Sequence, residues 1–301
     1  SYDWFVNRCK TIGMDVKRAV ESIGTLGGGN HFIEIGKSKL SGDYWITIHT
    51  GSRNFGKVVC EYHQGIAEKR LKEKRSGNFN SEVERIKKEA PRDQIGNLIT
   101  EARKKFGLNF DININGLEYL EGDDVIEYLI DMIFAQKYAE VNRNEIGWIL
   151  LNASGKLISP KDIIETVHNF IDFKDFVIRK GAIRSYENER MIIPFNMRDG
   201  ILLCMGKSNA DWNFSAPHGA GRLMSRGAAR RALSLEDFKE TMKGIYSTSV
   251  CNNTLDESPM AYKDSKVIEN AITPTATILD RIIPVLNIKD KSDEGAKYRR
   301  K

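Results

Sequence analysis

Three of the five histidines in this 301-residue chain lie beside small or polar residues. His31 follows Gly-Gly-Asn, His49 precedes Thr-Gly-Ser, and His218 precedes Gly-Ala-Gly. An imidazole can bind a metal ion, transfer a proton or attack phosphorus, and neighbouring glycines let a bulky group approach it. A packed core histidine would more often have apolar neighbours on both sides. These three side chains are therefore candidate ligands or nucleophiles.

The stretch from Gly24 to Gly29 contains four glycines. Such a run permits a tight turn or a phosphate-cradling loop. It is not a Walker A loop, because no Gly-Lys-Ser/Thr follows, and it lacks the strand-first order of a dinucleotide-binding fold. Taken alone, the run indicates a turn or a phosphate site equally well.

Two predicted strands follow this glycine run. The segment 31–35 alternates so that His31 shares a face with Ile33, and in the segment 44–50 His49 shares a face with Thr47. Both histidines are expected to project toward the space that the loops enclose. A lone strand histidine is usually structural, but two on neighbouring strands beside glycine-rich turns favour a metal site.

Helices and short strands occupy the rest of the chain. Helices are expected over 1–22 and 57–75, and another is expected within 115–143, where Asp123 or Asp124 can cap it. His63 is assigned to a helix surface or edge without a role. The charge run 69–93 mixes both signs and is expected to be solvated. The fold class is therefore α+β, a mixed sheet surrounded by helices, with residues 1–301 as one catalytic domain.

Composition narrows the class of protein. A formal charge of +5 and a pI near 8.8 are compatible with a polyanionic partner but do not establish one. The four cysteines form no CxxC pair, which favours a reducing, cytoplasmic setting. No apolar run reaches the length of a membrane span, so no membrane partner is expected.

With His63 set aside, four histidines remain, and they suggest phosphate chemistry. Neutral imidazole is a common nitrogen ligand for Zn²⁺ or Mn²⁺. A nucleophilic imidazole gives a labile phosphoramidate, and a metal ion can offset charge on the phosphate oxygens. Glycine-rich backbone and an arginine would complete such a site. These residue types predict a metal-dependent enzyme that acts on a phosphate.

At these residues the chain resembles the RtcB family of RNA ligases. The similar segments occur in family order from about residue 20 to 290; they are LGGGNHFIEI, HTGSRNFG, AEVNR, VHNF, RKGAIRS, PHGAGRLMSR, ESPMAYKD and VLNIKD. The resemblance implies an enzyme that joins RNA 3′-phosphate or 2′,3′-cyclic phosphate ends, such as those of tRNA halves, to 5′-hydroxyl ends. It implies GTP and Mn²⁺ as cofactors.

The resemblance also implies a role for each matching residue. His218 would be guanylylated by GTP, and the Mn²⁺ ligands would be His31, His49 and His168. The guanylate pocket would be lined by Asn30, Phe32, Glu34, Asn169, Pro194, Phe195, Asn196, Met197, Gly219, Ala220, Gly221 and Lys289.

This sequence departs from the family pattern in two places. The family has an Asp and a metal-bridging Cys upstream of any segment present here. Three alternatives are open: the chain is a fragment, an N-terminal fragment supplying both ligands is a separate partner, or the second metal is lost. The run Pro194–Ile201 replaces a smaller Gly-Ser-Met run, and Ile201 stands where the family has Ser. Two alternatives stay open: a His-metal phosphohydrolase, and a non-catalytic RNA- or GTP-binding half of a split ligase.

Overall fold

The computed structural model describes residues 2–106, 118–155 and 163–292. The chain divides into two compact units, which are described separately here. Unit 1 comprises Ser1–Glu21 and Ser52–Tyr138, and unit 2 comprises Ser22–Gly51 and Ala139–Lys301. The assignment of residues 1–301 to one catalytic domain stays a prediction.

A five-stranded sheet forms the centre of unit 2. Its spatial order is β2-β1-β9-β7-β6, and each described pairing within it is antiparallel. Its strands are β1 (Phe32–Ser38), β2 (Tyr44–His49), β6 (Arg190–Pro194), β7 (Ile201–Gly206) and β9 (Ala276–Ile288). The α+β class is confirmed, although the sheet that was expected to be mixed has antiparallel pairings.

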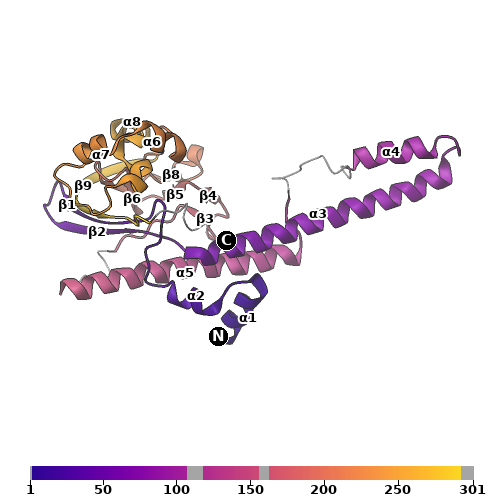
Figure 1. Ribbon diagram of the computed structural model, residues 1–301, viewed down its shortest axis with the longest axis horizontal. Helices are drawn as coiled ribbons and strands as arrows, with labels where there is room; N and C mark the ends of the chain where they lie inside the picture. Colours follow the sequence, from indigo (N-terminus) through magenta and orange to yellow (C-terminus); the bar gives the residue numbers. More distant parts are fainter. Residues whose placement is uncertain (1, 107–117, 156–162, 293–301) are drawn as a thin grey trace. The chain divides into compact units, whose positions relative to one another are not determined.

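Short helices cover one face of this sheet, as Figure 1 shows for α6 (Arg226–Ala232), α7 (Leu235–Thr241) and α8 (Ser265–Ala271). Each begins at a polar cap whose side chain accepts a backbone N–H, which satisfies a donor that the first turn leaves unpaired. Apolar side chains of β6, β7 and α8 form the buried core beneath them, among them Ile193, Leu202 and Ile268.

Unit 2 also contains two small two-stranded sheets. β3 (Asn169–Ile171) pairs with β4 (Ile178–Lys180), and β5 (Ala182–Arg184) pairs with β8 (Ser215–Pro217). Short 3₁₀ helices connect the remaining segments; they are η2 (Ala210–Trp212), η3 (Asn252–Glu257) and η4 (Pro259–Ala261). Through these pairings the ends of β3 and β8 come close to the turn at Gly181.

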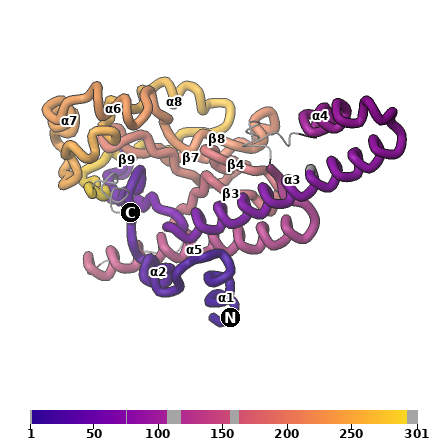
Figure 2. The backbone as a smooth tube through the Cα atoms, turned by 45° about the vertical axis from the view of Figure 1, so that its right-hand side comes forward, coloured from indigo at the N-terminus to yellow at the C-terminus, as the bar shows by residue number. Residues whose placement is uncertain are grey.

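Unit 1 is helical, and the tube in Figure 2 follows its course. Its helices are α1 (Tyr2–Ile12), α2 (Val16–Glu21), α3 (Arg53–Glu89), α4 (Ile95–Lys105) and the first part of α5 (Asp123–Ser154). Aromatic side chains of α1, α3 and α5 pack together around Phe55 and Phe134.

The expected helix boundaries differ from the observed ones. The helix expected over 1–22 is interrupted at Gly13, whose φ of 76° ends the first helix. The helix expected within 115–143 begins at Asp123, where the cap was expected, but it continues beyond residue 143 to Ser154. Residues 115–117 lie outside the described part. No helix in the described ranges is long and apolar enough to cross a membrane.

The prediction that His63 lies at the surface or edge of a helix was wrong. Its side chain is 2% exposed, and its Nε2 lies 2.8 Å from a carboxylate oxygen of Asp131. Arg8 binds the same carboxylate through two nitrogens. The three residues join α1, α3 and α5 inside unit 1, so His63 is a structural residue of the helical core.

Candidate active site

One pocket in unit 2 gathers the residues predicted to contact a nucleotide. With the exception of Asn169, every residue predicted to contact the guanylate lines it; these are Asn30, Phe32, Glu34, Pro194, Phe195, Asn196, Met197, Gly219, Ala220, Gly221 and Lys289. His49 and His218 line the same pocket. Residues from the glycine turn, β1, the end of β6, the segment after β8 and the end of β9 thus surround one space.

Four histidines form a row beside this pocket. The ring centroids of His31 and His49 are 6.0 Å apart, those of His49 and His168 are 5.3 Å apart, and those of His168 and His218 are 4.7 Å apart. His31 lies directly before β1 and does not share the face of His49, which pairs across the sheet with Phe32. The rings approach each other because His31 belongs to the turn and not to the strand.

The two central imidazoles are held neutral. Burial lowers the pKa of His49 to about 3, with the nearby imidazole of His168 acting in the same direction. Burial also lowers the pKa of His168 to about 4, and the neighbouring His218 adds to this shift. A neutral imidazole presents a lone pair, so both rings are suited to metal binding at neutral pH.

A single peptide turn orients the two histidines at the end of the row. Gly181, at a φ of 69°, donates its N–H to the carbonyl oxygen of His168 at 2.8 Å. Its own carbonyl oxygen lies 2.6 Å from Nδ1 of His218, which places the proton on that nitrogen. Nε2 of His218 then carries the lone pair. Asn169 does not line the pocket, but its side chain accepts a second hydrogen bond from the N–H of Gly181 at 3.1 Å.

Two buried acceptors lie in the pocket wall without partners among the described residues. Glu34 is 2% exposed, and one of its oxygens accepts a hydrogen bond from the amide of Asn287 at 2.9 Å. Its other oxygen, Oε1, and Oδ1 of Asn287 have no hydrogen-bond partner. Burial raises the pKa of Glu34 to about 8, although Asn287 and Lys289 act against that shift. A ligand with adjacent N–H donors would satisfy both atoms.

A buried ion pair forms another part of the wall. Nζ of Lys289 lies 2.9 Å from Glu257, and both side chains are 4% exposed. The same ammonium lies over the ring of Phe32 and donates to the carbonyl oxygen of Asn30. Burial lowers the pKa of Lys289, while the charge of Glu257 raises it. Lys289 is therefore fixed among the residues that line the pocket.

Arginines complete the positive side of the pocket. Arg222 and Arg226 both line it, and both bind the buried carboxylate of Glu257. The phenol of Tyr262 donates to the same carboxylate at 2.8 Å. Arg226 keeps 42% of its side chain exposed, so its guanidinium is accessible to an anion at the rim.

Sequence reasoning did not place four lining residues in the pocket; they are Gly200, Glu257, Tyr262 and Asn287. Glu257 and Tyr262 lie in the ESPMAYKD segment and Asn287 in VLNIKD, so the motifs contained the signal. Their roles depend on distant partners, which spacing along one segment cannot reveal.

A complete metal site is not present in the described part of the chain. Within residues 2–106, 118–155 and 163–292, no three His, Cys, Asp or Glu side chains converge closely enough to hold a metal ion. The imidazoles still have the right chemistry, because Nδ1 of His168 is buried without a hydrogen-bond partner there. Cys60 is exposed on α3, and Cys204 is buried in β7, where burial raises its pKa to about 12.

Comparisons with known proteins show the family to which the chain is similar. The sequence model of the RtcB family, described as tRNA-splicing ligase RtcB, matches residues 8–290. The RNA-splicing ligase RtcB of Escherichia coli (strain K12) is 27% identical over 282 residues, covering 89% of this chain and 61% of that protein. The tRNA-splicing ligase RtcB of Pyrobaculum aerophilum is 26% identical over 305 residues, covering 84% and 56%.

A third relative, the tRNA-splicing ligase RtcB of Methanopyrus kandleri, is 27% identical over 327 residues, covering 89% of this chain and 30% of that protein. The α+β fold with its histidine-lined pocket thus coincides with a match over nearly the whole chain. The chain belongs to the RtcB family. It spans about three-fifths or less of the length of these three relatives.

Proposed function

We propose that this chain carries the nucleotidyl-transfer centre of a GTP- and Mn²⁺-dependent RNA ligase. The reaction joins an RNA 3′-phosphate or 2′,3′-cyclic phosphate end, such as that of a tRNA half, to a 5′-hydroxyl end. Family membership supports this proposal. The observation that carries it is the hydrogen bond from Nδ1 of His218 to Gly181, which leaves Nε2 as a nucleophile in a residue that lines the pocket.

In the proposed first step, Nε2 of His218 attacks the α-phosphorus of GTP. A nitrogen–phosphorus bond forms, the bond from the α-phosphorus to the bridging oxygen breaks, and pyrophosphate leaves. An oxygen of the RNA 3′-phosphate then attacks the phosphorus of the bound GMP, a phosphoanhydride bond forms, and the nitrogen–phosphorus bond breaks to free His218. The 5′-hydroxyl oxygen attacks that activated end, and GMP departs.

The pocket wall supports guanine as the base. Guanine presents an N1–H and an amino group on one edge, and Glu34 Oε1 with Asn287 Oδ1 are two acceptors without partners in the described residues. Such donors would favour the ionised form of Glu34. Phe32, Phe195 and Met197 would enclose the apolar parts of the nucleotide, and Lys289 and Arg226 would attract its phosphates.

His31, His49 and His168 are the residues proposed to hold Mn²⁺, which would offset negative charge on the phosphate oxygens when bound. Three imidazoles leave room for further ligands, and the proposal includes an Asp and a Cys from an N-terminal segment of the kind found in the family. The cytoplasmic location stays a prediction that rests on cysteine usage.

The test uses α-labelled GTP and Mn²⁺ with the purified chain, followed by a denaturing gel. We expect label on the wild type and none on His218→Ala, and the adduct should be acid-labile, as a phosphoramidate is. Circular dichroism of both proteins controls for folding.

If the wild type takes no label alone, the assay is repeated with the upstream segment of the Escherichia coli relative added in trans. Label only with that segment would favour a split ligase. Metal-dependent phosphate release without an adduct in either assay would contradict the proposal and favour a phosphohydrolase.

A further inference from the structure

The loop between β3 and β4 presents a group of apolar side chains to solvent. Phe173 is 39% exposed, Phe176 is 71% exposed, and Ile178, at the start of β4, is 73% exposed. The two phenylalanine rings meet edge to face, with centroids 6.2 Å apart. We call these three residues the hairpin patch. Its contact with water is unfavourable unless a partner covers it.

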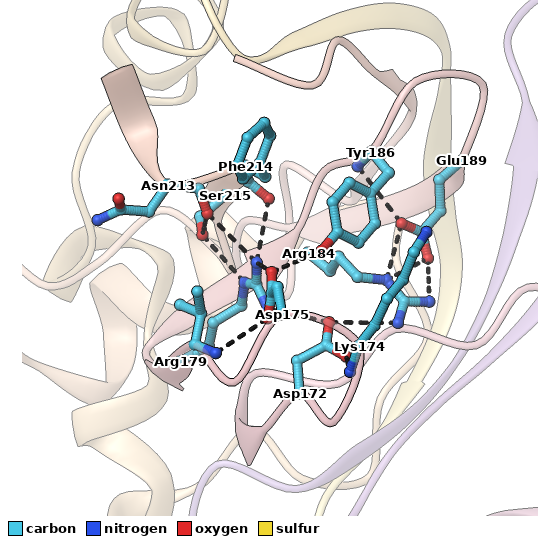
Figure 3. A network of polar contacts seen from close by, with 11 residues as sticks. Asp172, Lys174, Asp175, Arg179, Arg184, Tyr186, Glu189, Asn213, Phe214 and Ser215 are labelled. Carbon is cyan, nitrogen blue, oxygen red and sulfur yellow. Dashed lines mark hydrogen bonds and ion pairs between the residues drawn. The ribbon is translucent and has the colours of Figure 1, made fainter. Parts of the chain in front are cut away.

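A buried arginine holds the loop behind the patch rigid (Figure 3). Arg179 is 1% exposed and donates to Asp172 at 3.0 Å and to Asp175 at 2.7 Å. It also reaches Ser215 on β8, at the strand that leads to His218. Burial alone would raise the pKa of Asp175, but the hydrogen bonds from Arg179 and Tyr186 lower it below its ordinary value. The loop is therefore pre-organised, with the carboxylates of Asp172 and Asp175 both bound to Arg179.

Phe176 adopts a backbone conformation that its side chain disfavours. Its φ is 56°, in the left-handed region where a non-glycine residue costs about 1–2 kcal/mol. Its N–H donates to the carbonyl oxygen of Asp172 at 2.7 Å, and the next N–H donates to Asp175. These hydrogen bonds stabilise the strained conformation, in which the aromatic ring of Phe176 is exposed to solvent. Strain of this kind is concentrated at functional sites.

The charges around the hairpin patch favour an anionic partner. Arg179 and Arg184 form ion pairs with the carboxylates of Asp172, Asp175 and Glu189. These pairs offset the acidic charges near the hairpin patch, and two lysines add positive charge. Lys180 follows Ile178 on the same exposed face of β4, and Lys174 lies over the ring of Tyr186. Flat aromatic rings beside ammonium groups are the surface that single-stranded nucleic acids bind.

The patch lies in line with the reacting histidines. His168 directly precedes β3, and Gly181, which binds His218, directly follows β4. The two strands are three residues long, so the patch is about 10 Å from the histidine end of the hairpin at about 3.3 Å per residue. That distance corresponds to roughly three stacked nucleotides at about 3.4 Å each.

We propose that Phe173 and Phe176 stack the bases of the RNA strand about two to three nucleotides from the end that reacts at His218. This inference rests on the proposed function, because it takes the polyanion to be RNA. Lys180, between the patch and the histidines, contacts the intervening phosphate.

The experiment measures the affinity of a fluorescent single-stranded RNA with a 3′-phosphate by anisotropy. We expect Phe173→Ala and Phe176→Gly each to weaken binding roughly 5- to 150-fold, as loss of a stacked base does. Phe176→Tyr should retain binding. Because glycine accepts a positive φ, Phe176→Gly should also unfold at a higher temperature. Weaker RNA binding with higher stability separates a contact with RNA from a merely structural role.

Two controls sharpen the result. Tyr44→Ala removes an equally exposed aromatic ring with a lysine over it, at the end of β2 remote from His49, and should leave affinity unchanged. An abasic site at the third nucleotide from the 3′-phosphate should weaken binding to the wild type and leave binding to Phe176→Gly unaltered.

GMP labelling of His218 is run on every variant, because that step needs no RNA. Weaker RNA binding with intact labelling supports the proposal. Labelling absent from the wild type, both alone and with the upstream segment added in trans, would count against the proposed function, while the RNA affinities would still report on the patch. Unchanged RNA affinity in both phenylalanine variants would overturn the proposal and favour a protein as the partner that covers the hairpin patch.

Discussion

Glu34 illustrates how a single residue in this pocket acquires unusual chemistry. The sequence showed that Glu34 lies in a segment that alternates as a strand does. It could not show that Glu34 is buried beside Asn287, which is 253 residues away and donates a hydrogen bond to it. For the same reason the sequence did not show that His63 is buried, because its partner Asp131 is 68 residues away. Local spacing identified the histidines beside glycines, because close backbone approach leaves a signal in the neighbouring residues. It could not identify side chains whose surroundings come from distant segments.

A pH dependence of stability follows from Glu34. Burial raises its pKa from 4.5 to about 8, so the folded protein binds this proton more tightly than the unfolded chain. The stabilisation is complete below about pH 4.5 and is lost as the pH rises toward 8. His49 and His168 have the opposite sign, but their effect lies below their ordinary pKa of 6.5.

Between pH 6.5 and 8 we therefore expect the wild type to lose up to about 2 kcal/mol more unfolding free energy than Glu34→Gln. Urea unfolding at several pH values measures this, and comparing the two proteins cancels the groups that both contain. Parallel curves for the two proteins would show that Glu34 titrates normally.

At the scale of elements, strands were predicted better than helix boundaries. The two segments around His31 and His49 alternate strictly and appear as β1 and β2. The apolar run 146–152 suits a strand as well as a helix, because short apolar runs are compatible with both. It continues the helical repeat that starts at Asp123 and forms the second half of α5. Packing against the sheet, where Gly147 faces Ile48, decides this outcome.

Two glycine substitutions should have opposite effects on the elements that contain them. A Cβ on Gly206 in β7 would lie 2.1 Å from the carbonyl oxygen of Tyr186, so Gly206→Ala should cost more than about 2 kcal/mol. A Cβ on Gly65, exposed within α3, meets no atom within 4 Å, and Gly65→Ala should stabilise the helix by about 0.5–1 kcal/mol. Denaturant titrations measure both, and a loss of stability in both variants would contradict the prediction.

At the scale of the whole molecule, the charge of +5 is not concentrated on the long helix α3. Arg85 lies between Glu82 and Glu89, and Lys87 lies beside Glu84, so their charges are largely offset. The interspersed acids in the sequence predicted this solvated surface. The positive side chains of the pocket and hairpin could not be located by composition, because they come from separate segments.

Salt dependence of RNA binding tests this distribution. Lys180→Gln should reduce the slope of log affinity against log salt by about 0.7, the value for one phosphate of a single strand. Arg85→Gln should leave the slope unchanged, because its acidic neighbours already balance it. Anisotropy titrations at several salt concentrations measure both. An equal reduction by the two variants would place RNA on the α3 surface as well.

The position of β9 in the middle of the large sheet affects how the protein is made. A ribosome releases β1, β2, β6 and β7 well before β9, yet β9 separates the first pair from the second. During synthesis the edges of β1 and β7 that later pair with β9 therefore have unpaired backbone N–H and C=O groups. Nascent chains with such exposed strand edges are prone to aggregation. Lys289, which follows β9 directly, arrives with it. A chain cut short before β9 lacks both the central strand of the sheet and this cation of the pocket wall.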